Sequence, residues 1–179
     1  INAKKYMIYF TLQRNDRKSL ITYYAYANKD FTGFESEPKQ LFSAKYGSID
    51  NDIIEKDGTY HLFYKGNTKD ENGKEIKNGI QQATSKSLKG KWKEDFKYLD
   101  AYAGKTPVEG SSIFKLNGKD EYVLMYDMYT SGRYEYQTST DLYHFSEPKA
   151  FTKDFFPRHG SVISLTRDEL QRLQEKWGY

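Results

Sequence analysis

A repeated order of short segments constrains the fold of this chain more strongly than any other feature of its sequence. The segment at 37–42 (EPKQLF) returns at 147–152 (EPKAFT), and a diverged copy lies between them at 94–99 (EDFKYL). The spacing corresponds to a period of about 55 residues. A Tyr-rich segment precedes each copy, at 6–10 (YMIYF), 60–64 (YHLFY) and 122–126 (YVLMY). The recurrence predicts three copies of one structural unit.

Each unit carries the signals of short strands. Hairpin dipeptides at 57–58 (DG) and 117–118 (NG) precede the second and third Tyr-rich segments, and these residue types tolerate the positive φ of a tight turn. Strand-like stretches at 48–55 and 108–116 precede the two turns. Two units therefore have four predicted strands, and the first unit lacks the first of them. Between the second and third strands of the second unit, the polar stretch 67–78 is predicted to be a solvated loop.

Four short antiparallel strands in a period of about 40 to 60 residues are typical of a β-propeller blade. The sequence therefore predicts an all-β chain built of propeller blades. A β-sandwich whose segments are similar by coincidence stays open as an alternative, because turn spacing alone does not exclude it.

The C-terminal part departs from the repeat. Residues 156–165 (FPRHGSVISL) resemble the first strand of a fourth unit, but no hairpin signal follows them. Thr166 and Glu169 instead form the pattern of a capping box. Apolar residues then recur at helical spacing, at Leu170, Leu173 and Trp177. The pattern predicts a short C-terminal helix over about 167–177.

Composition excludes several classes of protein. Of the 179 residues, 17 are Tyr, 11 are Phe and none is Cys. The abundance of Tyr suits strands, and the lack of Cys excludes a disulfide framework and a thiolate metal site. The 28 Lys and Arg and 25 Asp and Glu residues are interleaved, so the sequence predicts no nucleic-acid partner. The apolar runs are too short to cross a bilayer, and no membrane partner is expected.

Three polar residues stand at the starts of the predicted innermost strands: Asp50, Glu109 and His159. Because the inner strands of several blades face the central axis of a propeller, these side chains are expected to converge. Asp50 and Glu109 lie at near-equivalent positions before their hairpin turns, and two neighbouring carboxylates suit general acid and base catalysis. The alternative is that the carboxylates are turn or cap residues and that His159 is structural. The residues alone leave both interpretations open.

The order of the motifs resembles that of glycoside hydrolase family 43 over essentially the whole chain. The motifs are SID (48–50), DGTYHLFYK (57–65), TSKSLKGKW (84–92), VEGSSIF (108–114), GRY (132–134), TSTDL (138–142) and RHGSV (158–162). Members of that family are five-bladed propellers that hydrolyse arabinose- or xylose-containing polysaccharides with inversion. The resemblance implies that residues 1–179 form a partial five-bladed glycosidase domain, with about three of the five blades and without the first.

The resemblance also implies roles for individual residues. Glu109 matches the general acid that protonates the leaving oxygen. Asp50 matches the carboxylate that orients this acid and raises its pKa by like-charge repulsion. His159 matches a residue that borders substrate and a calcium ion or water in the central channel, and Arg133 is expected to contact substrate hydroxyls. No cofactor is required by this chemistry, and calcium is the one metal implied.

The general base is where the sequence departs from the family. That base is an Asp of the first blade, upstream of the region that matches here. The first Asp of this chain, Asp16, lies in a polar turn that suits a base poorly. Inversion needs a second carboxylate about 6.5 to 9.5 Å from the acid. The resemblance therefore implies that the chain is a fragment, or that a missing N-terminal segment or a partner chain completes it. The chain alone is expected to be inactive.

Two further functions stay open. A non-catalytic carbohydrate-binding or structural propeller fragment would hold glycans without a base. A related five-bladed family acts on fructosides, but the motif at 158–160 (RHG) argues against it. The expected polymeric substrate predicts an extracellular or periplasmic location for the mature protein.

Overall fold

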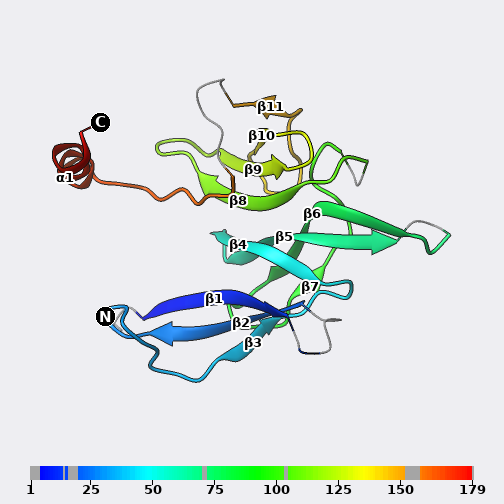
Figure 1. The fold of residues 1–179 in the computed structure, drawn as a ribbon, viewed down its shortest axis with the longest axis horizontal. Coiled ribbons are helices and arrows are strands. Elements are labelled where there is room, and N and C mark those ends of the chain that lie inside the picture. Colours follow the sequence, from blue (N-terminus) through cyan, green and yellow to red (C-terminus); the bar gives the residue numbers. More distant parts are fainter. Residues whose placement is uncertain are drawn as a thin grey trace.

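Three antiparallel sheets follow one another along the chain in a computed structural model, and a helix stands apart from them at the C-terminal end (Figure 1). The structure describes residues 5–13, 15, 20–69, 72–102, 105–151 and 158–178. The sheets contain three, four and four strands among these residues. This arrangement confirms the prediction of an all-β chain built of propeller blades.

The first sheet has the strand order β1-β2-β3. Its strands are β1 (Tyr6–Gln13), β2 (Leu20–Ala27) and β3 (Lys39–Phe42). As predicted, the described part of this sheet starts with the Tyr-rich strand and lacks the strand that begins the other two sheets. Asp16 lies outside the described residues.

The second and third sheets each have four strands in sequential order. The second contains β4 (Ser48–Lys56), β5 (Thr59–Lys69), β6 (Glu75–Ser85) and β7 (Lys93–Glu94). The third contains β8 (Glu109–Lys115), β9 (Tyr122–Met128), β10 (Arg133–Ser139) and β11 (Lys149–Ala150). The strands β4 and β8 are the predicted inner strands, and they lie beside each other at the boundary of the two sheets (Figure 1).

The two predicted hairpins differ in length. Lys56 pairs directly with Thr59, and the two residues between them, Asp57 and Gly58, both have positive φ. That is the backbone of a tight type I′ turn, which explains the Asp-Gly dipeptide. In the third sheet, Lys115 pairs with Tyr122, so the Asn-Gly dipeptide lies in a longer connection.

The Tyr-rich strand β5 is buried on both faces. Leu62, Phe63 and Tyr64 have no exposed surface. Phe63 packs in the core shared with the third sheet, whereas Leu62 and Tyr64 pack in the core shared with the first sheet. Neighbouring strand residues point to opposite faces, and burial of one such side chain stabilises a fold by about 1.5 to 3 kcal/mol. The aromatic composition therefore reflects the packing of successive sheets on one another.

The prediction of a solvated loop over 67–78 is wrong at both of its ends, residues 67–69 and 75–78, which belong to strands. β5 continues to Lys69, β6 begins at Glu75, and Thr68 pairs with Ile76. An antiparallel pair satisfies the backbone groups of both strands whatever the side chains are. The polar composition of this stretch therefore did not indicate a loss of pairing.

The prediction of a further strand over 156–165 is also wrong for the residues that the structure describes. Residues 158–165 form no ladder and are exposed, and residues 156–157 lie outside the described residues. A strand needs a partner for its backbone groups, and no hairpin follows this segment. It leads instead to the helix, away from the sheets (Figure 1).

The predicted helix is confirmed as α1 (Arg167–Trp177). The capping box is complete, because the Thr166 hydroxyl accepts the Glu169 N–H and the Glu169 carboxylate accepts the Thr166 N–H. None of its residues is buried. Within the described part of the chain, no helix is both long and apolar enough to span a bilayer.

Candidate active site

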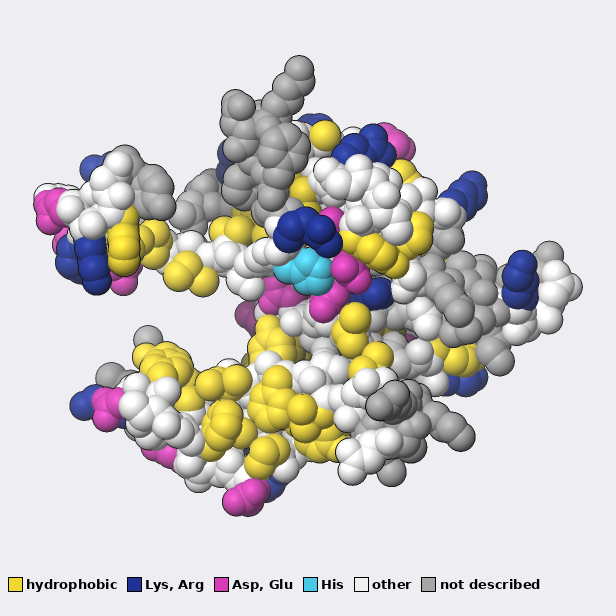
Figure 2. Space-filling view, in the orientation of Figure 1, with side chains coloured by type: hydrophobic (Ala, Val, Ile, Leu, Met, Phe, Trp, Pro, Cys, Tyr) yellow, Lys and Arg dark blue, Asp and Glu magenta, His cyan; other side chains and the backbone are white. Residues whose placement is uncertain are grey.

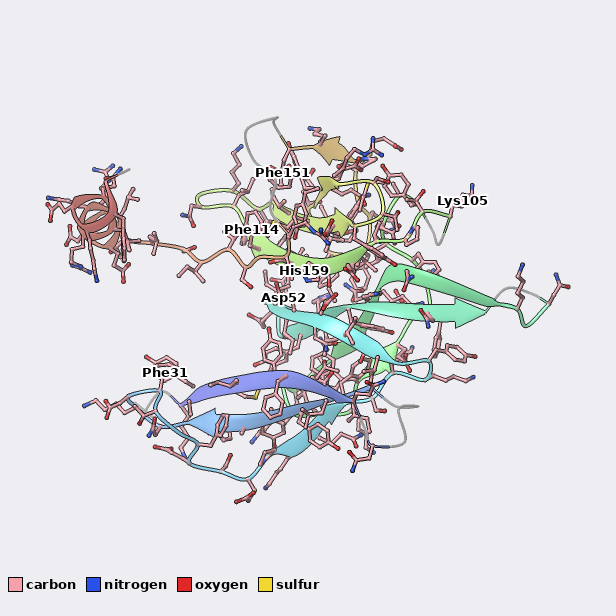
Figure 3. The ribbon with its side chains drawn as sticks, viewed as in Figure 1. Phe31, Asp52, Lys105, Phe114, Phe151 and His159 are labelled. Atoms are coloured by element: carbon pink, nitrogen blue, oxygen red, sulfur yellow. The ribbon has the colours of Figure 1, made fainter. Side chains whose placement is uncertain are left out.

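A cavity of about 520 Å³ opens where the inner strands of the second and third sheets meet. Its lining is mostly polar: Tyr9, Asp50, Asn51, Asp52, Gly110, Ser111, His159, Gly160 and Ser161. Figure 2 shows acidic side chains gathered around a histidine at this hollow, and Figure 3 identifies the histidine as His159, close to Asp52. Four separate parts of the chain therefore contribute to one polar site.

The structure brings together the three residues that the sequence singled out for the propeller axis. One ligand atom each from Asp50, Glu109 and His159 lie within 4.8 Å of one another. Glu109 and Asp50 are partly buried, and His159 is exposed. Their convergence is a finding of the structure, whereas the catalytic roles of these residues stay predictions.

The pairing registers align the inner strands of the two sheets residue by residue. Ile49 pairs with Lys65, and Glu109 pairs with Asp127. Lys65 and Asp127 each come directly after the Tyr-rich segment of their own unit. Glu109 is therefore the equivalent of Ile49, and Asp50 is the equivalent of the residue that follows Glu109. The predicted near-equivalence of the two carboxylates is confirmed, with an offset of one residue.

Three residues with left-handed backbones meet at the cavity, and they come from β4, from β8 and from the segment 158–165. They are Asp50 with φ of 54°, Gly110 with φ of 63° and His159 with φ of 58°. The Asp50 carboxylate accepts the Gly110 N–H at 2.9 Å. A Cβ at Gly110 would lie 2.9 Å from the His159 ring, so only glycine fits here without displacement.

Asp50 is held at both its side chain and its backbone. A register shift lies between Ile49 and Asp52 in the pairing of β4 with β5, and bulges of this kind redirect side chains. The Asp50 carboxylate accepts a hydrogen bond from the Gly110 N–H. The Asp50 main-chain oxygen accepts a second one from the Ser111 hydroxyl, at 2.8 Å. Asp50 thus connects β4 to β8 immediately beside Glu109.

Glu109 lies between two potentially cationic groups. Its Oε2 accepts a hydrogen bond from Lys65 Nζ at 2.8 Å, and its Oε1 lies 3.3 Å from His159 Nε2. The side chain of Lys65 is 16% exposed and that of Glu109 is 19% exposed. The pair is therefore more shielded from solvent than an ordinary surface ion pair.

The charge of Lys65 determines the acidity of Glu109. Burial alone would raise the pKa of Glu109, but the hydrogen bonds and charges of Lys65 and His159 outweigh it and hold the pKa below its ordinary value. The net shift is thus opposite to the raised pKa expected for a general acid, and the effect of Asp50 on this pKa stays a prediction. The sequence reasoning missed Lys65, although its place after the Tyr-rich segment was a signal.

Asp127 is a second residue that the sequence reasoning missed. Its side chain is 1% exposed, and its Oδ2 accepts Arg158 Nε at 2.6 Å. His159 Nε2 lies 3.9 Å from the same oxygen. The other oxygen, Oδ1, is buried and has no hydrogen-bond partner among the described residues. Asp127 therefore anchors the segment that carries His159 against the third sheet.

Asp52 joins three sheets at the edge of the cavity. Its carboxylate accepts the Tyr9 hydroxyl at 3.3 Å, the Ser112 hydroxyl at 3.0 Å and the Ile113 N–H at 2.9 Å. Burial raises the pKa of Asp52, and the hydrogen bonds oppose that rise. This set of donors gives Asp52 a structural role in closing the cavity wall.

The cluster suits a water molecule or a sugar hydroxyl better than calcium. Calcium takes about six to eight oxygen ligands, whereas the cluster offers two carboxylates and an imidazole nitrogen. The Lys65 ammonium already lies against one oxygen of Glu109. The residues of this cluster therefore do not fit the calcium ion that the resemblance implies.

Arg133 does not join this cluster. Its guanidinium contacts the Met128 sulfur at 3.7 Å and the Glu135 carboxylate at 3.7 Å, both within the third sheet. Its side chain is 56% exposed. Contact of Arg133 with substrate stays a prediction.

Comparison with known proteins identifies a family. A family model described as "Probable glycosyl hydrolase domain", in the group related to glycoside hydrolase family 43, matches residues 2–171. A search of curated proteins finds no significant match.

Solved structures share the fold at low sequence identity. A GH43_1 enzyme from Xanthomonas citri is 19% identical with a TM-score of 0.57, over 82% of this chain and 51% of that one. The β-xylosidase RS223 is 15% identical with a TM-score of 0.57, over 82% and 55%. An endo-arabinase from Bacteroides thetaiotaomicron is 17% identical with a TM-score of 0.50, over 89% and 57%. This chain thus spans about half the length of these structures.

Proposed function

The chain belongs to the glycosyl hydrolase family related to glycoside hydrolase family 43, and from this premise we propose that the whole protein is an inverting glycosidase. The proposed substrates are arabinose- or xylose-containing plant polysaccharides or oligosaccharides. The observation that carries the proposal is the convergence of Asp50, Glu109 and His159 on one polar cavity. Similarity to a β-xylosidase and an endo-arabinase in fold supports this class of substrate.

In this proposal Glu109 is the general acid. It protonates the glycosidic oxygen as the bond to the anomeric carbon breaks, and a water molecule attacks that carbon from the opposite face. A general acid works only in its protonated form, so the rate falls as pH rises through the pKa of Glu109. Because Lys65 and His159 hold this pKa low, the expected pH optimum lies on the acidic side.

Asp50 acts as a positioning residue in the same proposal. Its carboxylate holds the Gly110 N–H at 2.9 Å, and Gly110 follows Glu109 directly. The support for this role is geometric, because the contact fixes the backbone from which the Glu109 side chain extends. His159, 3.3 Å from Glu109, borders the place that the sugar would occupy and is proposed to contact it.

The general base is proposed to come from a further blade, supplied by a missing N-terminal segment or by a partner chain. The described chain leaves apolar surface on its first sheet, which Figure 2 shows as a gathering of hydrophobic side chains. Its large exposed members are Tyr6, Ile8, Leu12, Phe31 and Phe34. Since each propeller blade packs against a neighbour on both faces, this surface suits another blade.

The third sheet has a comparable surface. Phe114, Val123, Tyr136 and Phe151 help to line a cavity of about 600 Å³ on the third sheet. Figure 3 labels two of them, Phe114 and Phe151. This face likewise suits a further blade. A polymeric substrate would be met outside the cytoplasm, so we propose an extracellular or periplasmic location.

A second candidate function is that of a non-catalytic carbohydrate-binding propeller. The ion pair between Lys65 and Glu109 favours it, because an ionised carboxylate does not donate a proton. The two candidates differ in whether bound glycan is cleaved.

Hydrolysis by the complete protein and by Glu109→Gln separates the candidates. We expect Glu109→Gln to slow hydrolysis of xylo- and arabino-oligosaccharides by about 10²- to 10⁴-fold, with binding measured by calorimetry largely retained. Glu147→Gln, at an exposed position of the third unit, is the matched control and should be unaffected. A wild-type protein that binds these glycans but does not cleave them would favour the second candidate.

A further inference from the structure

The residue directly after each Tyr-rich segment (6–10, 60–64 and 122–126) contacts the part of the chain that follows its own unit. In the second unit, Lys65 Nζ donates to Glu109 Oε2 at 2.8 Å. In the third unit, Asp127 Oδ2 accepts from Arg158 Nε at 2.6 Å. Glu109 and Arg158 each immediately precede a residue with a left-handed backbone. The two ion pairs therefore occupy equivalent positions. In the first pair the cation comes earlier in the chain, and in the second pair the anion comes earlier.

The fold does not itself demand a charge at this position. The equivalent residue of the first unit is Thr11, whose hydroxyl oxygen accepts Asn51 Nδ2 at 2.8 Å. A neutral contact thus joins the first and second sheets where an ion pair joins the second and third. The lysine at this position is specific to the boundary that contains Glu109.

The Lys65 ammonium is held in place on two sides. It lies 5.3 Å from the centre of the Tyr129 ring, a distance at which a ring face attracts a cation. The Tyr129 hydroxyl in turn accepts Asn78 Nδ2 at 2.8 Å. With its side chain 16% exposed, Lys65 has little freedom to leave Glu109.

This arrangement makes the two carboxyl oxygens of Glu109 unequal. Oε2 accepts from Lys65, whereas Oε1 lies 3.3 Å from His159 Nε2, a residue that lines the cavity. A protonated carboxyl group keeps one oxygen that only accepts. Lys65 can therefore retain its hydrogen bond to Oε2 when Glu109 is protonated, provided that the proton is on Oε1.

We propose that Lys65 is a positioning residue that holds Oε2 of Glu109, so that Oε1 carries the proton to the leaving group. This inference rests on the function proposed above. The Oε1 proton passes to the glycosidic oxygen as the bond from that oxygen to the anomeric carbon breaks. Water forms the new bond to this carbon, and the carboxylate base of the further blade takes the water proton. Glu109 is left ionised, with Lys65 beside its negative charge.

The test compares Lys65→Met with Lys65→Arg in the complete protein. We expect Lys65→Met to lower kcat on an arabino- or xylo-oligosaccharide by about 100-fold while KM changes by less than about threefold. Lys65→Arg restores a donor to Oε2 and should recover kcat to within about tenfold of the wild type. Lys86→Met is the matched control, because Lys86 is exposed and bonds only Thr59 among the contacts described.

An unchanged kcat for Lys65→Met, or a loss confined to KM, would overturn the inference. If Lys65→Met does not fold, Lys65→Gln and Lys65→Arg make the same comparison. The ¹³C resonance of the Glu109 carboxyl provides a readout that does not need turnover. The chemical shift of this resonance should change in Lys65→Met and stay unchanged in Lys86→Met. An unchanged chemical shift in Lys65→Met would contradict the proposed contact. A wild type without hydrolysis but with this shift would refute the proposed function and leave the contact supported.

Discussion

The second and third sheets share a bulge at the start of the inner strand, but they place their carboxylates differently around it. In the second sheet the left-handed residue is Asp50 itself, and its carboxylate accepts the N–H of Gly110. In the third sheet the left-handed residue is Gly110, and the carboxylate belongs to the preceding residue, Glu109. This difference of one residue turns Asp50 toward the backbone of the next sheet and leaves Glu109 between Lys65 and His159. In the proposed function, position relative to the bulge determines which of the two carboxylates acts as the proton donor.

The largest expected effect on stability comes from the ion pair of the third sheet. Asp127 is 1% exposed, whereas Glu109 is 19% exposed. Arg158→Met leaves the buried Asp127 carboxylate without its donor and should lower the free energy of unfolding by about 2 to 3 kcal/mol. Lys65→Met leaves Glu109 able to reach water and should cost about 1 kcal/mol. Urea denaturation measures both, and equal losses would remove the distinction between the two pairs.

A smaller effect is expected at the bulge. Gly110→Ala forces a side chain into a left-handed backbone, which costs about 1 to 2 kcal/mol, and its Cβ would lie 2.9 Å from the His159 ring. Asp50→Gly at the equivalent position relieves the backbone cost but removes the acceptor of the Gly110 N–H, so its net change should be below about 1 kcal/mol. Thermal denaturation of the two variants tests this. A Gly110→Ala protein as stable as the wild type would show that the bulge tolerates any residue.

The smallest expected effect is a pH dependence from Glu109. Its pKa lies below the ordinary value of 4.5 in the folded chain. A lowered carboxyl pKa contributes stability that is present above the ordinary value and is lost as pH falls through the lowered one. At pH 7 the wild type should therefore have a higher melting temperature than Glu109→Gln. The difference between the two melting temperatures should shrink at about pH 3. A difference that stays constant between these pH values would mean that the ion pair does not stabilise the fold.

Most of the fold could be predicted from the sequence because it is repeated. The Tyr-rich segments, their hairpin dipeptides and the capping box at Thr166 each correspond to local backbone requirements, and the strands β5 and β9 and the helix α1 lie where those signals placed them. Pairing partners were harder to predict. Within the polar stretch 67–78, Thr68 and Lys69 pair with Ile76 and Glu75, whereas residues 158–165 do not pair despite their strand-like pattern.

The candidate site was predictable in its members but not in its electrostatics. Asp50, Glu109 and His159 were found because they stand at the starts of inner strands. The distances of Asp50 and Glu109 to their hairpin dipeptides, seven and eight residues, already give the one-residue offset of Asp50 from Glu109, but they do not predict the bulges. The contact of Lys65 with Glu109 joins residues 44 positions apart, and its effect on the Glu109 pKa depends on side-chain geometry that the sequence does not contain.

The most direct test of the account is the dependence of hydrolysis on the leaving group in the complete protein. The fluoride ion of a glycosyl fluoride leaves without being protonated by an acid. The glycosidic oxygen of an oligosaccharide must receive a proton before the sugar can leave. We predict that Glu109→Gln slows oligosaccharide hydrolysis by about 10²- to 10⁴-fold and fluoride hydrolysis by less than about tenfold. Asp50→Asn, which perturbs the position of the acid, should slow the oligosaccharide less than Glu109→Gln does. Equal losses on both substrates in Glu109→Gln, or a larger selective loss in Asp50→Asn, would contradict the assignment of Glu109 as the proton donor.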